Sequence, residues 1–201
     1  AGKATDIGDP SGAIGLYVRK PDSAQSWLVR SVFEPKANPA DWLDNNVLNV
    51  DRARIQETDV APVSGPAFVV KRDAPSEADF ALSPLPAGRE LAYPGAADAV
   101  AAAITGFAFS DAKPSVSFNF ANGPRLITKT FDGLTVTVQL VAQDGAIWAT
   151  VYAEGSSGEP AREARDIDAH TNGWAYKLPT DKGQLFMTTL DSLLKPLAPK
   201  Q

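Results

Sequence analysis

Two Asp-Gly dipeptides, Asp132-Gly133 and Asp144-Gly145, stand between runs of alternating apolar and polar residues. This pattern is the strongest short-range signal for a β-hairpin, because a two-residue type I′ turn needs positive φ at both central positions, and Asp-Gly accepts it. The segment 124–154 is therefore predicted to form three antiparallel strands. The other segments are expected to pack on or beside this sheet.

Two-residue turns also fix which side chains share a face of the sheet. With Asp132-Gly133 as the turn, Phe131 pairs with Leu134; with Asp144-Gly145, Leu140 pairs with Ala149. Both registers place one apolar set on the predicted core face: Ile127, Phe131, Leu134, Val136, Val138, Leu140, Ile147, Ala149 and Val151. The opposite face is predicted to be rich in threonine, with two aromatic rings that are either covered by another element or exposed: Thr128, Thr130, Thr135, Thr137, Gln139, Thr150, Trp148 and Tyr152.

The remaining segments predict an α+β fold with mainly antiparallel sheets. Residues 1–13 are expected to be a loose arm, and residues 14–122 to form two ββαβ-like units, at about 14–60 and 67–120. The helix of the first unit is predicted to begin at Pro39, after Asn38 as N-cap. Residues 123–201 are expected to combine the three-stranded meander with a C-terminal helix over 181–195, packed with the preceding units.

Composition bounds the chemistry of the chain. It has 201 residues, of which 44% are hydrophobic, so it is long and apolar enough to form a core. Its formal charge of −5 leaves no basic surplus to neutralise phosphates, so no nucleic-acid partner is expected. The sequence contains no cysteine, which excludes disulfides, thiolate nucleophiles and cysteine-ligated metal centres.

A search for catalytic motifs finds none. Neither GxGxxG nor GxxxxGK[ST] occurs, and the single histidine, His170, is expected to be a solvated or capping residue. The close carboxylate pairs, Asp41 with Asp44 and Asp166 with Asp168, do not have the spacing of a metal loop. We therefore predict no catalytic residue, no metal ligand, no cofactor-binding residue and no cofactor. A hydrolase whose carboxylates are dispersed along the chain stays open as an alternative.

Tryptophans are the best candidates for a binding surface, because aromatic rings favour peptide and carbohydrate sites. Trp27 and Trp42 lie in apolar segments and are expected in the core, and Trp174 is expected to anchor the C-terminal segment to the sheet. Trp148 lies with Tyr152 on the threonine-rich face, which makes that face a candidate site for a periplasmic glycan or peptide. The candidate interaction surface comprises Trp148, Tyr152, Thr137 and Gln139.

Three stretches together resemble a bacterial family of unknown function, DUF4340: GRELAYPGAADAVAAAITGFAFSDAKP, FDGLTVTVQLV with DGAIWATVYAEG, and NGWAYKLPTDKGQLFMTTLDSLLK. The last contains the Gly173-Trp174-Ala175-Tyr176-Lys177-Leu178-Pro179 signature before a Leu-rich helix. The resemblance extends from about Ile14 to Lys195. It implies a protein with one membrane helix and the rest outside the cytoplasm, encoded beside ABC-transporter components of the gliding-motility type.

The function expected on these grounds is a non-enzymatic, extracytoplasmic interaction or accessory domain. In the full-length protein, an inner-membrane anchor absent from this chain is expected to hold it on the periplasmic side, with membrane transporter subunits as partners. The resemblance supplies no catalytic residues. The oligomeric state stays open at this stage.

Overall fold

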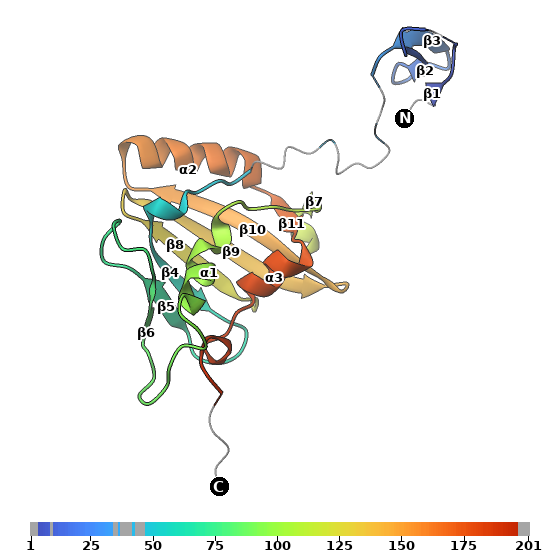
Figure 1. Cartoon of the computed structure of the whole chain (residues 1–201). Coiled ribbons are helices and arrows are strands. Elements are labelled where there is room, and N and C mark those ends of the chain that lie inside the picture. The colour runs from blue at the N-terminus through green and yellow to red at the C-terminus, as the bar shows by residue number, and fades with distance from the viewer. Residues whose placement is uncertain (1–3, 9, 34–35, 37–41, 43–46, 197–201) are drawn as a thin grey trace. The chain divides into compact units, whose positions relative to one another are not determined.

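The computed structural model describes residues 4–8, 10–33, 36, 42 and 47–196 (Figure 1). The chain forms two compact units, residues 1–44 and residues 45–201. This boundary falls inside the first predicted ββαβ unit. The helix predicted from Pro39, with Asp41 and Asp44, lies outside the described residues.

The N-terminal unit contains a three-stranded antiparallel sheet in the order β1-β2-β3: β1 Ala4–Thr5, β2 Ile14–Arg19 and β3 Ser26–Ser31. The predicted loose arm is wrong at Ala4–Thr5, because these residues pair with Leu16 and Gly15 of β2. Asp22, with a φ of 61°, lies in the turn between β2 and β3.

The second unit is built on one eight-stranded antiparallel sheet in the order β6-β5-β4-β8-β9-β10-β11-β7 (Figure 1). Its strands are β4 Ile55–Ala61, β5 Phe68–Lys71, β6 Ala81–Ser83, β7 Asp111–Pro114, β8 Arg125–Thr130, β9 Leu134–Gln143, β10 Ala146–Gly155 and β11 Trp174–Lys177. The α+β prediction is thus confirmed. The second predicted ββαβ-like unit does not form a compact unit of neighbouring strands. Its strands β5 and β6 lie at one end of the sheet, and β7 lies at the other.

Three α-helices and short 3-10 helices accompany the sheet: η2 Arg52–Arg54, α1 Ala96–Ala101, η3 Ala102–Ile104, η4 Ser115–Ser117, α2 Gly158–Thr171, α3 Thr180–Phe186 and η5 Asp191–Leu193. The C-terminal helix is predicted over 181–195, but the helix α3 ends at Phe186. Thr188 donates its hydroxyl to the carbonyl oxygen of Leu185 at 2.6 Å, an alternative to helix continuation that follows the end of α3. The three α-helices cover the face of the sheet that carries Leu134, Val136 and Val138, all 0% exposed, because buried residues of each helix belong to the same hydrophobic core.

The second Asp-Gly turn forms as predicted. Asp144 and Gly145 have φ values of 53° and 72°, as a type I′ turn requires. Leu140 pairs with Ala149 and Val138 with Val151. These side chains lie on the core face of β9 and β10.

The first Asp-Gly turn has one residue more than predicted, and the predicted register there is wrong. Phe131, Asp132 and Gly133 form a three-residue loop in which the Leu134 amide donates to the Thr130 hydroxyl at 2.9 Å. Thr128 therefore pairs with Val136 and Ile127 with Thr137. The shift moves Thr128 and Thr130 onto the core face and Ile127 onto the opposite one.

The buried threonine pair on the core face is satisfied internally. The Thr58 and Thr128 hydroxyls lie 3.0 Å apart across β4 and β8, and both residues are buried. A threonine therefore replaces an aliphatic residue without leaving a buried polar group unpaired.

Arg72 is the most deeply buried charged residue in the described part of the chain, at 5% exposed. Its guanidinium donates to the carbonyl oxygens of Ile55 at 2.8 Å, Ala53 at 2.6 Å and Arg52 at 2.9 Å. A further bond reaches the carbonyl of Glu77 at 2.8 Å. The aromatic rings that flank the guanidinium belong to Phe80, at 4.8 Å, and Phe131, at 5.6 Å.

We expect Arg72→Met to lower the free energy of unfolding by about 3 kcal/mol, because buried carbonyls would lose their charged donor. Arg72→Lys should restore less than half of this loss, since an ammonium cannot reproduce the planar fork of donors. Urea unfolding followed by circular dichroism measures both effects. Lys71→Met, at the exposed neighbouring position, is the matched control and should change stability by less than about 0.5 kcal/mol. If Arg72→Met and the control had equal free energies of unfolding, the Arg72 guanidinium would not stabilise the fold as stated.

Candidate interaction surface

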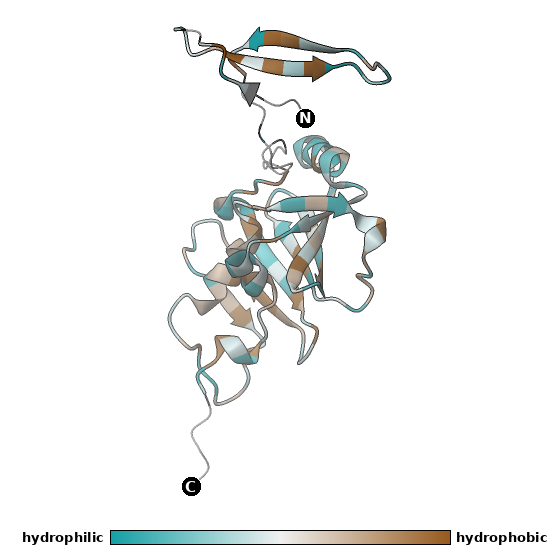
Figure 2. Ribbon diagram, turned by 90° about the vertical axis from the view of Figure 1, so that its right-hand side faces the viewer, coloured by the Kyte–Doolittle hydropathy of each residue, from teal (hydrophilic) through white to brown (hydrophobic). Residues whose placement is uncertain are grey.

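Exposed apolar side chains are concentrated in the N-terminal unit. Of the fifteen large hydrophobic residues that are exposed in the described parts of the chain, nine belong to this unit. They are Ile7, Tyr17, Val18, Trp27, Leu28, Val29, Val32, Phe33 and Trp42. The other six are spread over the much longer second unit. Figure 2 shows hydrophobic residues, in brown, along both long strands of the small sheet.

Both faces of this small sheet are apolar. The register pairs Leu16 with Val29 and Val18 with Trp27, so these four side chains share one face. Tyr17 pairs with Leu28 on the other face, where they are 48% and 52% exposed.

Gly15 lies in the middle of the second face and lets other side chains pass over the strand. A Cβ atom at this position would lie 2.6 Å from Cγ2 of Ile7 and 3.0 Å from Cδ1 of Leu28. Ile7 and Leu28 therefore converge above Gly15 and extend the apolar surface of this face across β2.

The N-terminal unit buries little of its own apolar surface. Ala13 and Leu16 are the hydrophobic residues that are buried among those described in this unit. A small antiparallel sheet gains its stability by packing a hydrophobic face against another layer. The exposed rings and branched side chains thus form a surface that is suited to being covered.

Two aromatic rings extend the apolar surface beyond β3. The rings of Phe33 and Trp42 lie 5.5 Å apart, and the Trp42 indole donates to the carbonyl of Lys36 at 3.0 Å. Both side chains are more than half exposed. The prediction that Trp27 and Trp42 lie in the core is therefore wrong.

The predicted surface on the main sheet is reduced by the burial of Trp148. This residue is 4% exposed, because the Phe118 ring lies 4.7 Å away and the Lys113 ammonium lies 4.9 Å from its ring. Tyr152 is 46% exposed on the same face. Thr137 and Gln139 are partly exposed, and Gln139 donates to the carbonyl of Phe120 at 3.3 Å. Tyr152, Thr137 and Gln139 thus remain accessible without the Trp148 ring.

The face of the main sheet opposite its core carries paired charges on β4 and β8, whereas both faces of the N-terminal sheet are apolar. Lys129 of β8 bonds Glu57 at 2.6 Å and Asp59 at 2.8 Å across to β4. Hydrogen bonds to Asp59 and Glu57 raise the pKa of Lys129 to about 12. The solvent-exposed charges on this part of the face are therefore paired with one another.

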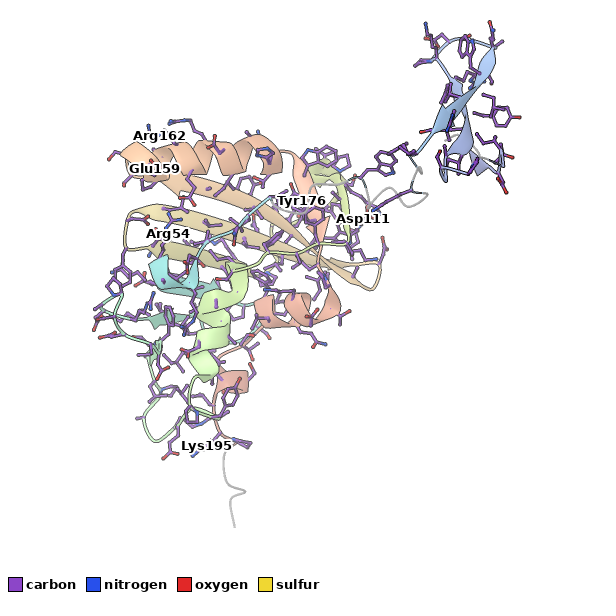
Figure 3. All side chains as sticks on the ribbon, turned by 45° about the horizontal axis from the view of Figure 1, so that its top comes forward. Arg54, Asp111, Glu159, Arg162, Tyr176 and Lys195 are labelled. Carbon is purple, nitrogen blue, oxygen red and sulfur yellow. The ribbon has the colours of Figure 1, made fainter. Side chains whose placement is uncertain are left out.

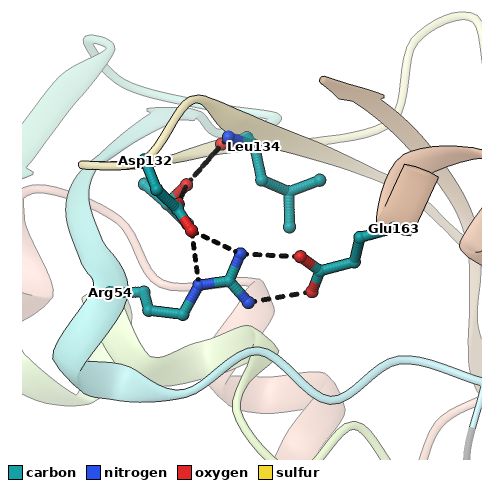
Figure 4. Close-up of polar contacts among 5 residues, drawn as sticks. Arg54, Asp132, Leu134 and Glu163 are labelled. Carbon is teal, nitrogen blue, oxygen red and sulfur yellow. Dashed lines mark hydrogen bonds and ion pairs between the residues drawn. The ribbon is translucent and has the colours of Figure 1, made fainter. Parts of the chain in front are cut away.

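A charged cluster joins three elements of the second unit (Figures 3 and 4). Arg54, at the end of η2, donates from Nη1 and Nη2 to the two carboxylate oxygens of Glu163 in α2 at 2.9 and 2.6 Å. Its Nε donates to Asp132 in the β8–β9 loop at 3.0 Å. Burial acts to raise the pKa of Asp132, but hydrogen bonds from Thr130 and Arg54 outweigh it and lower the pKa. Glu163 raises the pKa of Arg54 further above its ordinary value.

A groove of about 450 Å³ runs along α2 beside residues 47–49 and is lined by Glu159, Arg162, Glu163, Asp166 and His170. Because it is lined by three carboxylates, it is a candidate place for a dispersed-carboxylate hydrolase site. Glu163 is already held by Arg54, and Glu159 accepts from Arg162 at 2.9 Å. His170 lies exposed in the last turn of α2, with Nδ1 2.7 Å from the carbonyl oxygen of Asp166. Glu159, Arg162 and Glu163, which line the groove, are thus engaged in ion pairs within the chain.

Among the described residues, no group of three or more histidines and carboxylates is placed to hold a metal ion. No helix in the described segments is long and apolar enough to cross a membrane.

The fold and the surface define an α+β protein whose unusual feature is an apolar N-terminal sheet. The model of the domain of unknown function DUF4340 matches residues 5–118, and the chain belongs to this family. The matched region contains the N-terminal sheet except Ala4, and the second unit as far as Phe118. The Gly173–Pro179 signature lies outside it. No curated protein and no solved structure matches the chain.

The signal that could have revealed the surface was present in the sequence. Ile14–Val18 and Trp27–Val29 are continuous apolar runs, with a single glycine at position 15, where a one-sided strand would alternate with polar residues. Such runs indicate strands that are apolar on both faces. The sequence did not show that the described residues of the small unit form no second layer to cover them.

Tyr176 of β11, and not Trp174, anchors the C-terminal segment. Trp174 is 45% exposed, whereas Tyr176 is 3% exposed. The Tyr176 ring contacts Phe109 at 4.8 Å, and its hydroxyl donates to the carbonyl of His170 at 2.9 Å. Burial raises the pKa of Tyr176 to about 12.

We expect the free energy of unfolding to fall between pH 10 and about 12, and Tyr176→Phe to remove part of this fall. An unfolded tyrosine loses its proton near pH 10, whereas the folded Tyr176 keeps its proton up to about pH 12. The stability linked to this group is therefore complete below pH 10 and is lost as the pH rises through the folded pKa. Urea unfolding at several alkaline pH values measures the slope, with Tyr152→Phe as control. Identical slopes in all three proteins would show that Tyr176 does not titrate as stated.

Proposed function

We propose that this chain is a non-enzymatic protein-binding module and that its N-terminal sheet is the binding surface. The observation that carries the proposal is the concentration of exposed apolar side chains on both faces of that sheet. Monomeric proteins rarely leave such a patch uncovered, and patches of this kind mark interaction sites.

The chemistry of the surface fits a protein partner. Tryptophan, tyrosine and phenylalanine are enriched in the centres of protein interfaces, and Tyr17, Trp27, Phe33 and Trp42 supply them here. Full burial of one such side chain contributes on the order of 2 kcal/mol. Arg19 and Arg30, on the strands themselves, provide polar groups at the rim.

The partner we propose is a subunit of an ABC-type membrane transport complex, on the periplasmic side of the inner membrane. This part of the proposal rests on membership in DUF4340 and on the resemblance described above. The accessory protein would be held there by an anchor outside this chain.

The proposal is tested by co-purification of the full-length protein with transporter subunits from native membranes. Two double variants, Trp27→Ser with Val29→Ser and Tyr17→Ser with Leu28→Ser, are each compared with the wild type. We expect at least one of them to reduce the amount of co-purified subunit tenfold or more. The four side chains are at least 36% exposed, so the fold of the second unit should not change.

Val116→Ser is the matched control, because Val116 is 91% exposed in the second unit. It should leave co-purification unchanged. Wild-type yields from both double variants, or a wild-type protein that brings down no transporter subunit, would count against the proposal.

A further inference from the structure

In the part of the chain that the structure describes, the strand β3 is an open edge of the N-terminal sheet. Among the residues that the structure describes, β3 has a neighbouring strand on one side only, which is β2. The opposite edge of the sheet is β1, which is two residues long, whereas β3 has six. β3 is therefore the longer of the two edges on which another strand can pair.

β3 carries few of the devices that prevent such pairing, and its one charged residue is Arg30. Natural edge strands carry charged side chains, most often lysine, or proline or a bulge, or they are very short. The sequence of β3, Ser-Trp-Leu-Val-Arg-Ser, contains neither lysine nor proline, and the β2–β3 ladder runs through all six residues without a register shift. Trp27, Leu28 and Val29 form an apolar centre with strong β-propensity.

The sequence of β3 is complementary to itself in one antiparallel register. With Leu28 of one copy opposite Leu28 of the other, Trp27 lies opposite Val29 and Ser26 opposite Arg30. Every apolar residue then meets an apolar residue, and the sheet faces of the two copies stay aligned.

Neighbouring registers are less favourable. A pairing centred on Val29 would set Leu28 opposite Arg30. A pairing centred on Arg30 would bring two guanidinium groups together, and like charges directly opposite each other are destabilising. The match of charge and apolarity therefore selects the register centred on Leu28.

We propose that β3 pairs with β3 of a second copy of this chain, antiparallel and centred on Leu28. The pairing is isologous, because each copy contributes the same strand, and it closes at a dimer. It joins two three-stranded sheets into one of six strands. The inference rests on the proposed function, since the joined sheet doubles the apolar surface that is offered to the partner.

The absence of cysteine from the chain permits a direct test by oxidative cross-linking. In the proposed register the two Cβ atoms at position 28 lie directly opposite, about 5 Å apart, which is close to disulfide reach. We expect Leu28→Cys at low micromolar concentration to form a reducible dimer at least tenfold faster than Val116→Cys, the exposed control in the second unit.

Register is tested with two further single variants. Trp27→Cys mixed with Val29→Cys should give the heterodimeric cross-link, because these positions are opposite. Val29→Cys alone should cross-link much more slowly, because its two copies are diagonal neighbours. Equal rates for Leu28→Cys, Val29→Cys and Val116→Cys would overturn the proposal.

The unmodified protein provides an independent measurement. Light scattering after size exclusion should give twice the chain mass of 21.2 kDa. Leu28→Lys, which places two ammonium groups opposite each other, should give a single chain mass with an unchanged circular dichroism spectrum. A wild type that stays monomeric up to about 100 µM would overturn the dimer.

Failure of this inference is distinguishable from failure of the proposed function. A monomeric wild type whose transporter co-purification is still lost in Trp27→Ser with Val29→Ser removes the dimer and leaves the binding module. A dimer that brings down no transporter subunit removes the proposed partner and leaves the strand pairing. A Leu28→Cys cross-link to a different protein in native membranes would assign the edge to that protein and overturn self-pairing.

Discussion

The buried guanidinium of Arg72 is the interaction on which the second unit depends. It donates hydrogen bonds to the carbonyl oxygens of Arg52, Ala53 and Ile55, which lie where η2 leads into β4. No described carboxylate forms an ion pair with it, so carbonyl dipoles and aromatic rings compensate its charge. Because this turn is held, Arg54 within it reaches Asp132 and Glu163 and connects the sheet to α2.

The two units differ in how far they bury the apolar side chains of their sheets. In the second unit, helices cover one face of an eight-stranded sheet, and the opposite face carries paired charges such as Lys129 with Glu57 and has Phe118 packed over Trp148. In the N-terminal unit, both faces of the sheet are apolar and have no covering layer among the described residues of that unit. The first arrangement is complete within the chain. The second is one that gains from a partner, and this contrast is the physical basis of the proposed function.

The paired Asp-Gly turns show how far local sequence reaches. Asp144-Gly145 forms the two-residue turn that its chemistry favours, and the register of β9 with β10 follows from it. Asp132-Gly133 has the same dipeptide but sits in a three-residue loop, because the Thr130 hydroxyl accepts the Leu134 amide and closes the loop one residue earlier. That single bond moves Ile127 off the core face. A side-chain hydrogen bond of this kind is not encoded in the dipeptide.

Sequence alone determined the class of the fold, the strands on either side of both turns, the exclusion of cysteine chemistry, and the family. These properties depend on local patterning and composition, which can be read residue by residue. Only the tertiary structure decided that β7 joins the far end of the sheet, that Phe118 covers Trp148, and that Trp27 and Trp42 are exposed. Each of these depends on which distant segments meet, and an apolar run looks the same whether a second layer covers it or not.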